Sequence, residues 1–269
     1  MKKYLRNNFI SFVSHVGLSY IYRTLKKREG SLVRVLVFHD VQDASWFENM
    51  MTSLNKRYNL LTPDSFLKKQ YDSNRINVLI TFDDGYLSWV DVCLPILKEK
   101  GIKALFFINS GLIDVFEHQD IQEQYIRGNL LLSPRKTLSW DGVKKLHEAG
   151  HMIGGHTTTH PRLSELHEDR QRETVVQDKK RIEEILNTSI RTFAYPFGQR
   201  NDYTPETVGI VKESGYTHSF TTEGVFVNAY NQFEFSRLCV EDGLSIGQLK
   251  QWIEGGYDLY HKIKTLCVR

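Results

Sequence analysis

Short apolar runs alternate along the chain with longer stretches in which hydrophobic residues recur every three or four positions. The apolar runs predict buried strands, because they leave no polar face for solvent. These strands are expected over residues 33–39, 78–82, 103–108, 151–156, 192–195, 216–222 and 233–240. Helices are expected between them, over residues 46–58, 89–100, 139–150, 163–187, 204–215 and 245–253. Strand–helix alternation repeated about seven times predicts an α/β fold, closed most economically into a distorted (β/α)7 TIM-like barrel.

The region from residue 31 to residue 269 is expected to form a single domain. It contains no internal repeat, no low-complexity run and no Pro/Gly/Ser-rich linker. Residues 111–136 are polar and irregular in pattern, which predicts an excursion that decorates this domain. A chain of 269 residues is long enough to bury one large core.

Residues 1–30 precede this domain and predict an amphipathic helix. Its apolar face lies between clusters of Lys and Arg and consists of Leu5, Phe9, Phe12, Val16 and Tyr20. The segment is too short and too polar to span a bilayer. Two alternatives stay open: the helix packs on its own domain, or residues 4–25 make a peripheral contact with the inner membrane face.

The charge limits the class of partner that is expected, and the cysteine content indicates the redox compartment. The formal net charge is only +3 and no basic run accompanies an aromatic ladder, so nucleic acid is not expected as a partner. Cys93, Cys239 and Cys267 are scattered and odd in number, which is typical of reduced thiols. The N-terminal segment also lacks a small-residue cleavage site. We therefore expect a cytoplasmic protein, attached peripherally to the inner membrane face under the second alternative above.

The first candidate chemistry lies where the strand over residues 78–82 runs into Asp83, Asp84 and Gly85. Two adjacent buried carboxylates repel each other and have lost their hydration, and a cation or a proton between them compensates both costs. Gly85 allows an immediate turn, so that both carboxylates can point into one cleft. An ordinary Asp-Asp-Gly surface turn is the alternative, and other residues must decide between the two.

Ligand-type side chains recur at other predicted strand ends. In a parallel barrel, functional residues gather at the C-terminal ends of the strands. His39 and His156 lie at two such ends, and His160 follows four residues after His156. This spacing alone is weak, because the chain has ten histidines. Together with the acid pair, however, it indicates a catalytic divalent metal site with one carboxylate, two imidazoles and open positions.

Three motifs, in the same order along the chain, resemble those of the polysaccharide deacetylase family, carbohydrate esterases related to the nodulation-factor and chitin deacetylases. They are Thr81-Phe-Asp-Asp-Gly85, His156-x-x-x-His160 and Phe193-Ala-Tyr-Pro-Phe-Gly198. The likeness covers roughly residues 39–253. The form of the third motif is similar to that of the exopolysaccharide-linked branch of the family.

The resemblance implies a hydrolase that removes N-acetyl groups from N-acetylhexosamine units. Its partner would be an acetylated glycan or a lipid-linked or nucleotide-linked sugar precursor. Asp84, His156 and His160 would hold a divalent metal, commonly zinc in this family, with cobalt, nickel or manganese also used. Asp83 would be the general base for a metal-bound water.

Other roles follow from the third motif and its surroundings. The resemblance implies that the backbone N–H of Phe197 stabilises the oxyanion. It also implies that the substrate contacts Tyr86, Tyr195 and Pro196.

Two positions depart from the family pattern. Ala194 stands where many members carry the arginine that holds the catalytic Asp, and Arg237 on the last predicted strand is the candidate to pair with Asp83 instead. The motif that supplies the general acid is not evident, so His39 is the leading candidate and His218 the second. A solvated arginine and hydrogen-bonded core histidines are the alternatives.

Other functions stay open for the same residues. An O-acetyl esterase, or an amidase for a small non-sugar amide, would use the same site. A non-catalytic glycan-binding protein is the third hypothesis, and the intact acid and histidine pairs argue against it.

Overall fold

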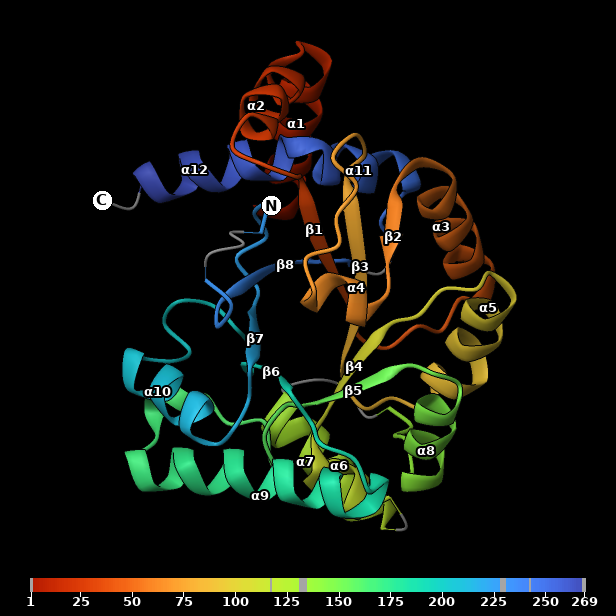
Figure 1. Ribbon diagram of the computed structural model, residues 1–269, viewed down its shortest axis with the longest axis vertical. Coiled ribbons are helices and arrows are strands. Elements are labelled where there is room, and N and C mark those ends of the chain that lie inside the picture. The colour runs from red at the N-terminus through yellow and green to blue at the C-terminus, as the bar shows by residue number, and fades with distance from the viewer. Residues whose placement is uncertain (1, 117, 131–134, 228–230, 242, 268–269) are drawn as a thin grey trace.

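The computed structural model describes residues 2–116, 118–130, 135–227, 231–241 and 243–267 (Figure 1). The strands are β1 (Val33–Phe38), β2 (Asn59–Leu61), β3 (Asn77–Asp84), β4 (Leu105–Ile108), β5 (Met152–Gly155), β6 (Thr192–Ala194), β7 (His218–Thr221) and β8 (Phe235–Cys239). All strands except β2 form a closed ring of seven parallel strands, in which β8 pairs with β1 and β1 with β3. The short β2 pairs with the first residues of β3. The predicted (β/α)7 barrel is therefore confirmed.

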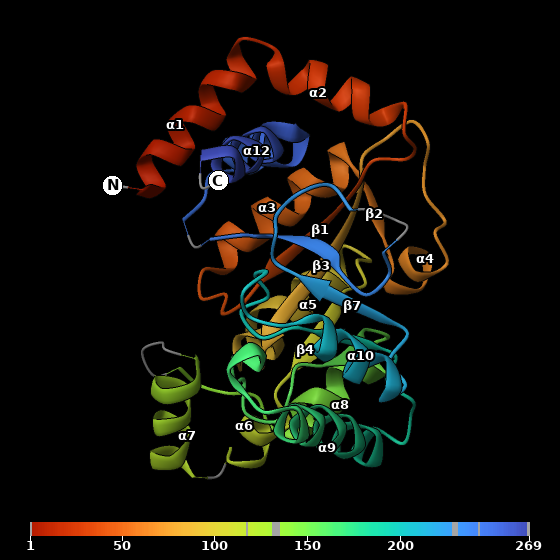
Figure 2. The same cartoon turned by 90° about the vertical axis from the view of Figure 1, so that its left-hand side faces the viewer.

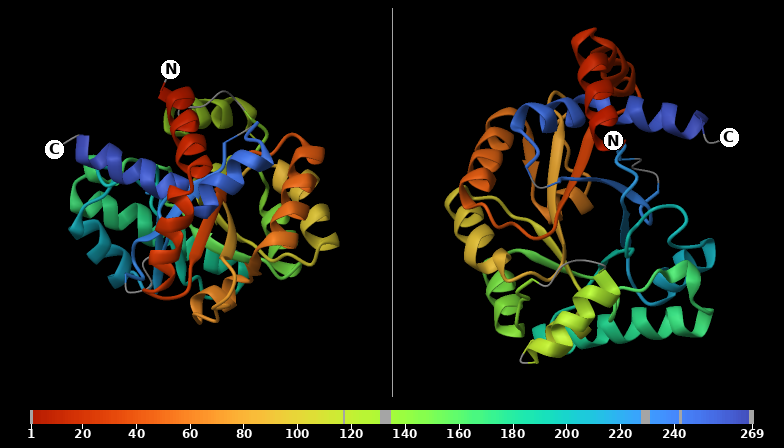
Figure 3. Two further views of the ribbon diagram at one scale, coloured as in Figure 1. Left: turned by 90° about the horizontal axis from the view of Figure 1, so that it is seen from above. Right: turned by 180° about the vertical axis from the view of Figure 1, so that it is seen from behind.

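Helices cover the outside of the barrel (Figures 1 and 3). They are α1 (Lys2–His15), α2 (Leu18–Lys27), α3 (Ala44–Arg57), α4 (Pro63–Leu67), α5 (Leu94–Glu99), α6 (Ser110–Asp114), α7 (Gln119–Tyr125), α8 (Trp140–Glu148), α9 (Glu168–Leu186), α10 (Pro205–Glu213), α11 (Ile246–Gln251) and α12 (Tyr257–Cys267). Short 3-10 or π-helical segments are η1 (Trp89–Cys93), η2 (Ile126–Leu130), η3 (Leu163–Glu165) and η4 (Trp252–Gly256).

Helix starts follow the capping signals in the sequence. Thr62, Ser139, Thr204 and Ser245 each accept a hydrogen bond from the backbone N–H three residues later. Such caps satisfy donors that the first helical turn would otherwise leave unpaired, each contributing about 1 kcal/mol. The helices after Ser139, Thr204 and Ser245 begin where the sequence predicts.

Some elements differ from the prediction. Residues 111–130 are largely helical, in α6, α7 and η2, while residues 117 and 131–134 lie outside the described part. The predicted N-terminal helix is two helices, because Gly17 takes a left-handed φ of 78°. The sequence pattern also missed β2, which has only three residues, and α12. Cys93 and Cys239 are free thiols, and the side chain of Cys267 is outside the described part.

The alternation of side chains along the strands separates two cores. Val78, Ile80 and Phe82 pack outward against helices, whereas Leu79 packs in the barrel interior. The same period of two turns Asp83 toward the interior at the end of β3. Parallel register places Val35 of β1 beside Arg237 of β8. The fold thus brings Arg237 and Asp83, which are 154 positions apart in the sequence, together in the barrel interior.

A buried ion pair links α12 to the barrel. Arg34 of β1 is fully buried and pairs with Asp258. Its guanidinium also donates to the carbonyl oxygens of Ile253 at 3.0 Å and Gly224 at 3.2 Å. Asp258 in turn accepts from the backbone N–H of Phe226 at 2.8 Å. The C-terminal helix is therefore attached to the barrel by a buried ion pair and the hydrogen bonds around it.

Candidate active site

The acid pair lies at the C-terminal end of β3, inside the barrel mouth. Asp83 and Asp84 are each only 3% exposed, which excludes the surface-turn alternative. The chain leaves extended geometry at Asp84 itself, with φ of 90°, and continues through Gly85 at φ of 123°. A positive φ is uncommon for a non-glycine residue, and such strained positions cluster at functional sites. This turn is what lets two consecutive carboxylates enter one cleft.

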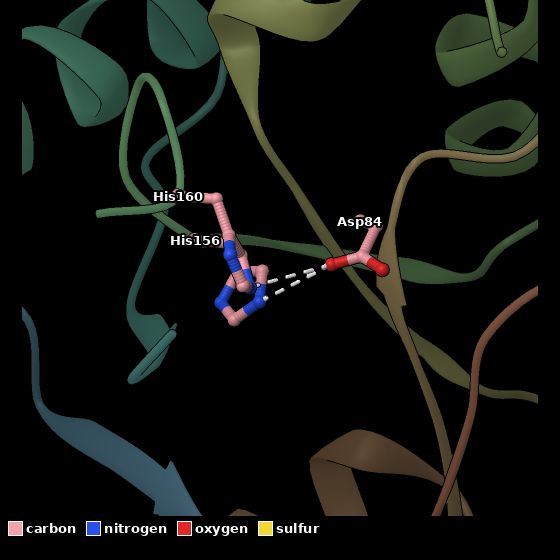
Figure 4. A group of neighbouring side chains, drawn as sticks. All are labelled: Asp84, His156 and His160. Carbon is pink, nitrogen blue, oxygen red and sulfur yellow. Dashed lines mark ion pairs between the residues drawn. The ribbon is translucent and has the colours of Figure 1, made fainter. Parts of the chain in front are cut away.

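Asp84 faces both predicted histidines (Figure 4). Its Oδ1 lies 3.6 Å from His156 Nε2 and 3.6 Å from His160 Nε2. One ligand atom from each residue lies within 4.8 Å of the others. The two imidazoles come from the end of β5 and the loop after it, and His160 also has a left-handed φ of 52°.

The hydrogen bond that Nδ1 makes in each imidazole determines whether Nε2 carries a proton. His156 Nδ1 lies 2.7 Å from the carbonyl oxygen of Ala194, and His160 Nδ1 lies 3.4 Å from that of Asn129. A carbonyl oxygen only accepts, so Nδ1 must donate. In the neutral rings Nε2 then carries a lone pair that points toward Asp84. Three electron-pair donors face one another across 3.6 Å, and a cation is what satisfies them all. These residues fit a divalent metal.

Electrostatics within the site favour bound positive charge. Burial lowers the pKa of His160 to about 4, so its ring is neutral, as a metal ligand must be. Burial also acts to lower the pKa of His156, but the carboxylates of Asp83 and Asp84 outweigh it and raise that pKa. For Asp84, burial acts to raise the pKa, and the neighbouring histidines overcome it and lower it. The site therefore binds a cation, whether a proton or a metal, between its carboxylates and imidazoles.

Asp83 has a different environment from Asp84. Arg237 of β8 holds it with two parallel contacts of 2.6 Å, from Nη1 to Oδ1 and from Nη2 to Oδ2. Both side chains are almost completely buried. Burial acts to raise the pKa of Asp83, but the Arg237 guanidinium outweighs it and lowers the pKa. Arg237 is itself positioned by the carbonyl oxygen of Thr221 at 3.2 Å. The structure thus pairs Asp83 with Arg237, the residue predicted to replace the arginine that is missing from the third motif.

A cleft of about 880 Å³ opens above this constellation. The acid pair, both metal-type histidines, His39 and Phe197 contribute to its lining. The centroid of the Phe197 ring lies 4.6 Å from that of His160. The Arg162 guanidinium also contacts the Phe197 ring, 4.4 Å from its centroid. Arg162 also pairs with Asp202, a further lining residue. The lining of the cleft therefore includes aromatic and charged side chains as well as the aliphatic Leu130 and Val240.

The backbone N–H of Phe197 is available to a ligand. Phe197 has a left-handed φ of 59°, and its carbonyl oxygen accepts from Thr222 Oγ1 at 2.7 Å. Within the described residues, its own N–H makes no hydrogen bond to the chain. Phe197 is partly exposed and lines the cleft. It lies where the sequence predicts an oxyanion donor.

The structure does not bring every predicted residue into the cleft. Tyr195 and Pro196 are buried behind its wall, and the Tyr195 ring stacks on Tyr203 at 4.3 Å. Neither side chain lines the cleft, so the structure does not place them where the sequence predicted a contact with substrate. His218 lies at the start of β7, where its Nδ1 is 2.8 Å from Thr217 Oγ1, so it is at the wrong end of the barrel for a general acid. His39, at the opposite strand end, does line the cleft.

Two residues support the metal group in ways that the sequence pattern did not reveal. Tyr86, expected to contact substrate, is fully buried and donates its hydroxyl to Asp84 Oδ2 at 3.0 Å. Asp178 of α9 accepts from the backbone N–H of His156 at 3.0 Å and of Ser110 at 2.9 Å. Asp178 lies in a highly charged stretch; only its three- and four-residue spacing from buried Val175 and Ile182 could have indicated an inward position.

Comparison with known proteins agrees with this geometry. The family model described as polysaccharide deacetylase matches residues 70–219, more than half of the chain. YxkH of Bacillus subtilis (strain 168) is 25% identical over 242 residues, which cover 86% of this chain and 79% of that protein. The poly-β-1,6-N-acetyl-D-glucosamine N-deacetylase of Staphylococcus aureus is 23% identical over 261 residues, covering 91% of this chain and 77% of that protein.

A solved structure shares the fold. The Streptococcus pyogenes deacetylase PplD in complex with acetate has a TM-score of 0.68 at 21% identity, and the match covers 82% of this chain and 98% of that one. The matched family region contains the acid pair, both metal-type histidines and the turn at Phe197. The chain therefore belongs to the polysaccharide deacetylase family and is a hydrolase.

Proposed function

We propose that the chain is a metal-dependent N-deacetylase for N-acetylhexosamine units of a glycan. The observation that carries this proposal is the division of the acid pair. Asp84 faces two imidazole nitrogens at 3.6 Å, while Asp83 pairs with Arg237, which favours its ionised form. One carboxylate is thereby suited to hold a cation and the other to accept a proton.

The donor set suits zinc, because one carboxylate and two imidazoles are ligands of catalytic zinc sites; cobalt, nickel and manganese are alternatives. When bound by Asp84, His156 and His160, such an ion would polarise the acetyl carbonyl and make water more acidic. Tyr86 leaves one Asp84 oxygen free for this purpose by binding the other. Asp178 holds the backbone of His156 in place.

The chain's own groups supply the remaining steps. Asp83 Oδ2 faces the histidine pair, 3.9 Å from His156 Nε2, and would take the proton of the attacking water. The unpaired N–H of Phe197 would donate to the oxygen on which negative charge develops. His39 lines the same cleft and would give a proton to the departing amine. The products are acetate and a free amine on the sugar.

The substrate class is supported by the cleft and by a relative. A volume of about 880 Å³ lies within the range of roughly 300–1,000 Å³ that is usual for small-molecule sites. Charged and aromatic walls suit the hydroxyl groups and ring faces of sugars. The Staphylococcus aureus relative is named for poly-β-1,6-N-acetyl-D-glucosamine, so oligomers of that polymer are the first substrate to examine.

Acetate release from a substrate panel tests the proposal. The panel contains β-1,6-linked and β-1,4-linked N-acetylglucosamine oligomers, a nucleotide-linked N-acetylhexosamine, an O-acetylated glycan and a small aryl acetamide. We expect the zinc-loaded protein to release acetate from an N-acetylated sugar substrate. Release from the O-acetylated glycan alone, or from the aryl acetamide alone, would replace the proposal with the corresponding esterase or amidase.

Asp83→Asn identifies the base. The substitution keeps the size of the side chain and removes its charge, so we expect acetate release to fall by at least about 10²-fold. The exposed Asp141→Asn on α8 is the matched control and should act as the unchanged protein does. Equal rates for the two variants would refute the role of Asp83.

A further inference from the structure

One face of the α1–α2 helix pair is apolar and exposed. The exposed large hydrophobic side chains of the two helices are Tyr4, Leu5, Phe12, Val16, Leu18, Tyr20, Ile21 and Leu25, which are 46–70% exposed. Tyr20 does not share a face with Leu18 and Leu25 and lines a groove beside α2 instead. In the described part of the chain, fourteen large hydrophobic residues are exposed, and these eight belong to one segment of 22 residues. Single exposed hydrophobic residues are ordinary, but a contiguous group indicates an interaction surface.

The other face of α1 is already used for packing. Ile10 and Val13 are buried, and Phe9 packs against Tyr260 of α12. Gly256 of η4 makes this approach possible, since a Cβ there would lie 2.8 Å from Ile10 Cγ2. The helix pair lies across α12 at one end of the molecule (Figures 1 and 2). The helices are thus held by one face, and the exposed apolar face has no partner among the described residues.

The sequence left open whether the N-terminal segment packs on its own domain, and the structure shows that it does so without burying most of the predicted apolar face. The periodic face predicted from the sequence includes Leu5, Phe12, Val16 and Tyr20, and these are the exposed residues. Of that predicted face, Phe9 packs inward. The helix therefore packs on its own domain mainly through other residues and presents the predicted apolar face outward.

The charge of the same segment is strongly positive. Residues 1–28 contain seven Lys or Arg and no Asp or Glu, whereas the whole chain has a formal net charge of +3, which leaves −4 for residues 29–269. Lys26, Lys27 and Arg28 directly follow the last exposed apolar residue of α2. A groove of about 490 Å³ beside α2 has four Arg or Lys residues and one Glu among its lining. Negative groups are the complement of this surface.

We propose that the α1–α2 face binds the surface of an anionic lipid bilayer. The apolar side chains would enter the boundary between headgroups and acyl chains, and the basic residues would contact lipid phosphates. In the described residues, no helix is long and apolar enough to cross a membrane, so the contact is with the surface. A second copy of the chain is a poorer partner, because a two-fold contact would bring two such basic segments together.

The position of the helix pair relates the bilayer to the cleft. Arg6 in the first turns of α1 pairs with Glu241 at 2.8 Å, and Glu241 lines the active-site cleft. A bilayer against the exposed face would therefore lie beside one rim of the cleft. This inference does not depend on which acetylated compound the site accepts.

Vesicle co-sedimentation of the full chain tests the proposal. Equimolar phosphatidylglycerol–phosphatidylcholine vesicles should bind the protein, binding should weaken with added salt, and phosphatidylcholine vesicles should bind it much less. Phe12→Ser combined with Val16→Ser should reduce binding at least tenfold. The matched control combines Val176→Ser and Ile121→Ser, exposed apolar residues away from the helix pair, and should bind as the unchanged protein does.

The charge contribution has its own variant. Replacing Lys26, Lys27 and Arg28 by Gln should lower partitioning into anionic vesicles by about a hundredfold, since each basic residue near the surface contributes about a factor of five. Replacing Arg170, Lys145 and Lys180 by Gln on α8 and α9 is the matched control. Thermal unfolding of each variant verifies that it is folded.

Three results would overturn the proposal. The first is equal vesicle binding by the apolar variant and its control. The second is equal binding of the unchanged protein to anionic and neutral vesicles. The third is absence of vesicle binding together with concentration-dependent dimers that Phe12→Ser and Val16→Ser abolish, which would assign the face to a second copy of the chain.

Discussion

Arg237→Met is the substitution that best tests how the site works. The methionine side chain fills most of the volume of the arginine but removes both 2.6 Å contacts to Asp83. Asp83 then remains in a site where it is 3% exposed, next to Asp84. A buried carboxylate without a partner either protonates or destabilises the protein.

The expected magnitude follows from the burial of both partners. Removing one member of a buried ion pair costs about 3–5 kcal/mol, and 1.4 kcal/mol corresponds to a factor of ten. This free energy is shared between a less stable fold and a less available base, so we expect acetate release at neutral pH to fall by up to about 10³-fold. Arg237 now lowers the pKa of Asp83, so its loss raises that pKa. Because the base acts when deprotonated, activity is lost as pH falls through this pKa, and the acid limb of the pH–rate profile should move to higher pH.

The controls separate catalysis from stability. Arg237→Lys keeps a positive charge but not the two-pronged contact, and should give an intermediate rate. Arg34→Met removes another fully buried arginine, one that pairs with Asp258 far from the cleft. That variant should unfold at lower temperature without moving the acid limb. An unchanged acid limb in Arg237→Met, with a rate within about threefold of the unchanged protein, would refute the reasoning.

Three further predictions concern the metal, pH and a buried ion pair. His160→Ala should lose bound zinc in elemental analysis of zinc-loaded protein, whereas exposed His167→Ala should keep it; equal zinc content would contradict the ligand set. Burial, with a smaller effect of Lys103, lowers the pKa of His151 to about 4 from 6.5, so this neutral ring contributes stability above pH 6.5 that is lost as pH falls toward 4. His151→Asn should flatten this fall in urea titrations at a series of pH values, and an unaltered slope would disprove the assignment. Asp258→Ala should lower the free energy of unfolding by about 3–5 kcal/mol, since it strands a buried arginine; a loss below about 1 kcal/mol would show that water replaces the pair.

Local patterns in the sequence predicted the elements that depend on neighbouring residues. The apolar runs identified each strand of the closed ring, and caps such as Ser139 and Thr204 identified helix starts. Elements with weak local signals were missed: β2 is only three residues long, and α12 is attached through the long-range contact of Asp258 with Arg34. Such elements form because of tertiary packing, which a local pattern does not contain.

The same distinction applies to the site. Strand ends carrying Asp83, Asp84 and His156 could be placed together from the sequence, because parallel strands present their C-terminal ends on one face of a barrel. The turn at Asp84 needs a positive φ, which the following glycine suggested but did not specify.

Tertiary structure decided between the alternatives that the sequence left open for the supporting side chains, and it decided which faces stay exposed. Arg237 reaches Asp83 because closure of the barrel pairs β8 with β1, a contact between chain segments far apart in sequence. Tyr195, on the expected motif, is buried and donates its hydroxyl to the carbonyl oxygen of Phe233, while Tyr86 lines the cleft and donates its hydroxyl to Asp84. Helical periodicity identified an apolar face on the N-terminal segment, but only packing against α12 and η4 showed that this face is exposed. Periodicity is a property of neighbouring residues, whereas burial depends on what the rest of the chain brings to each face.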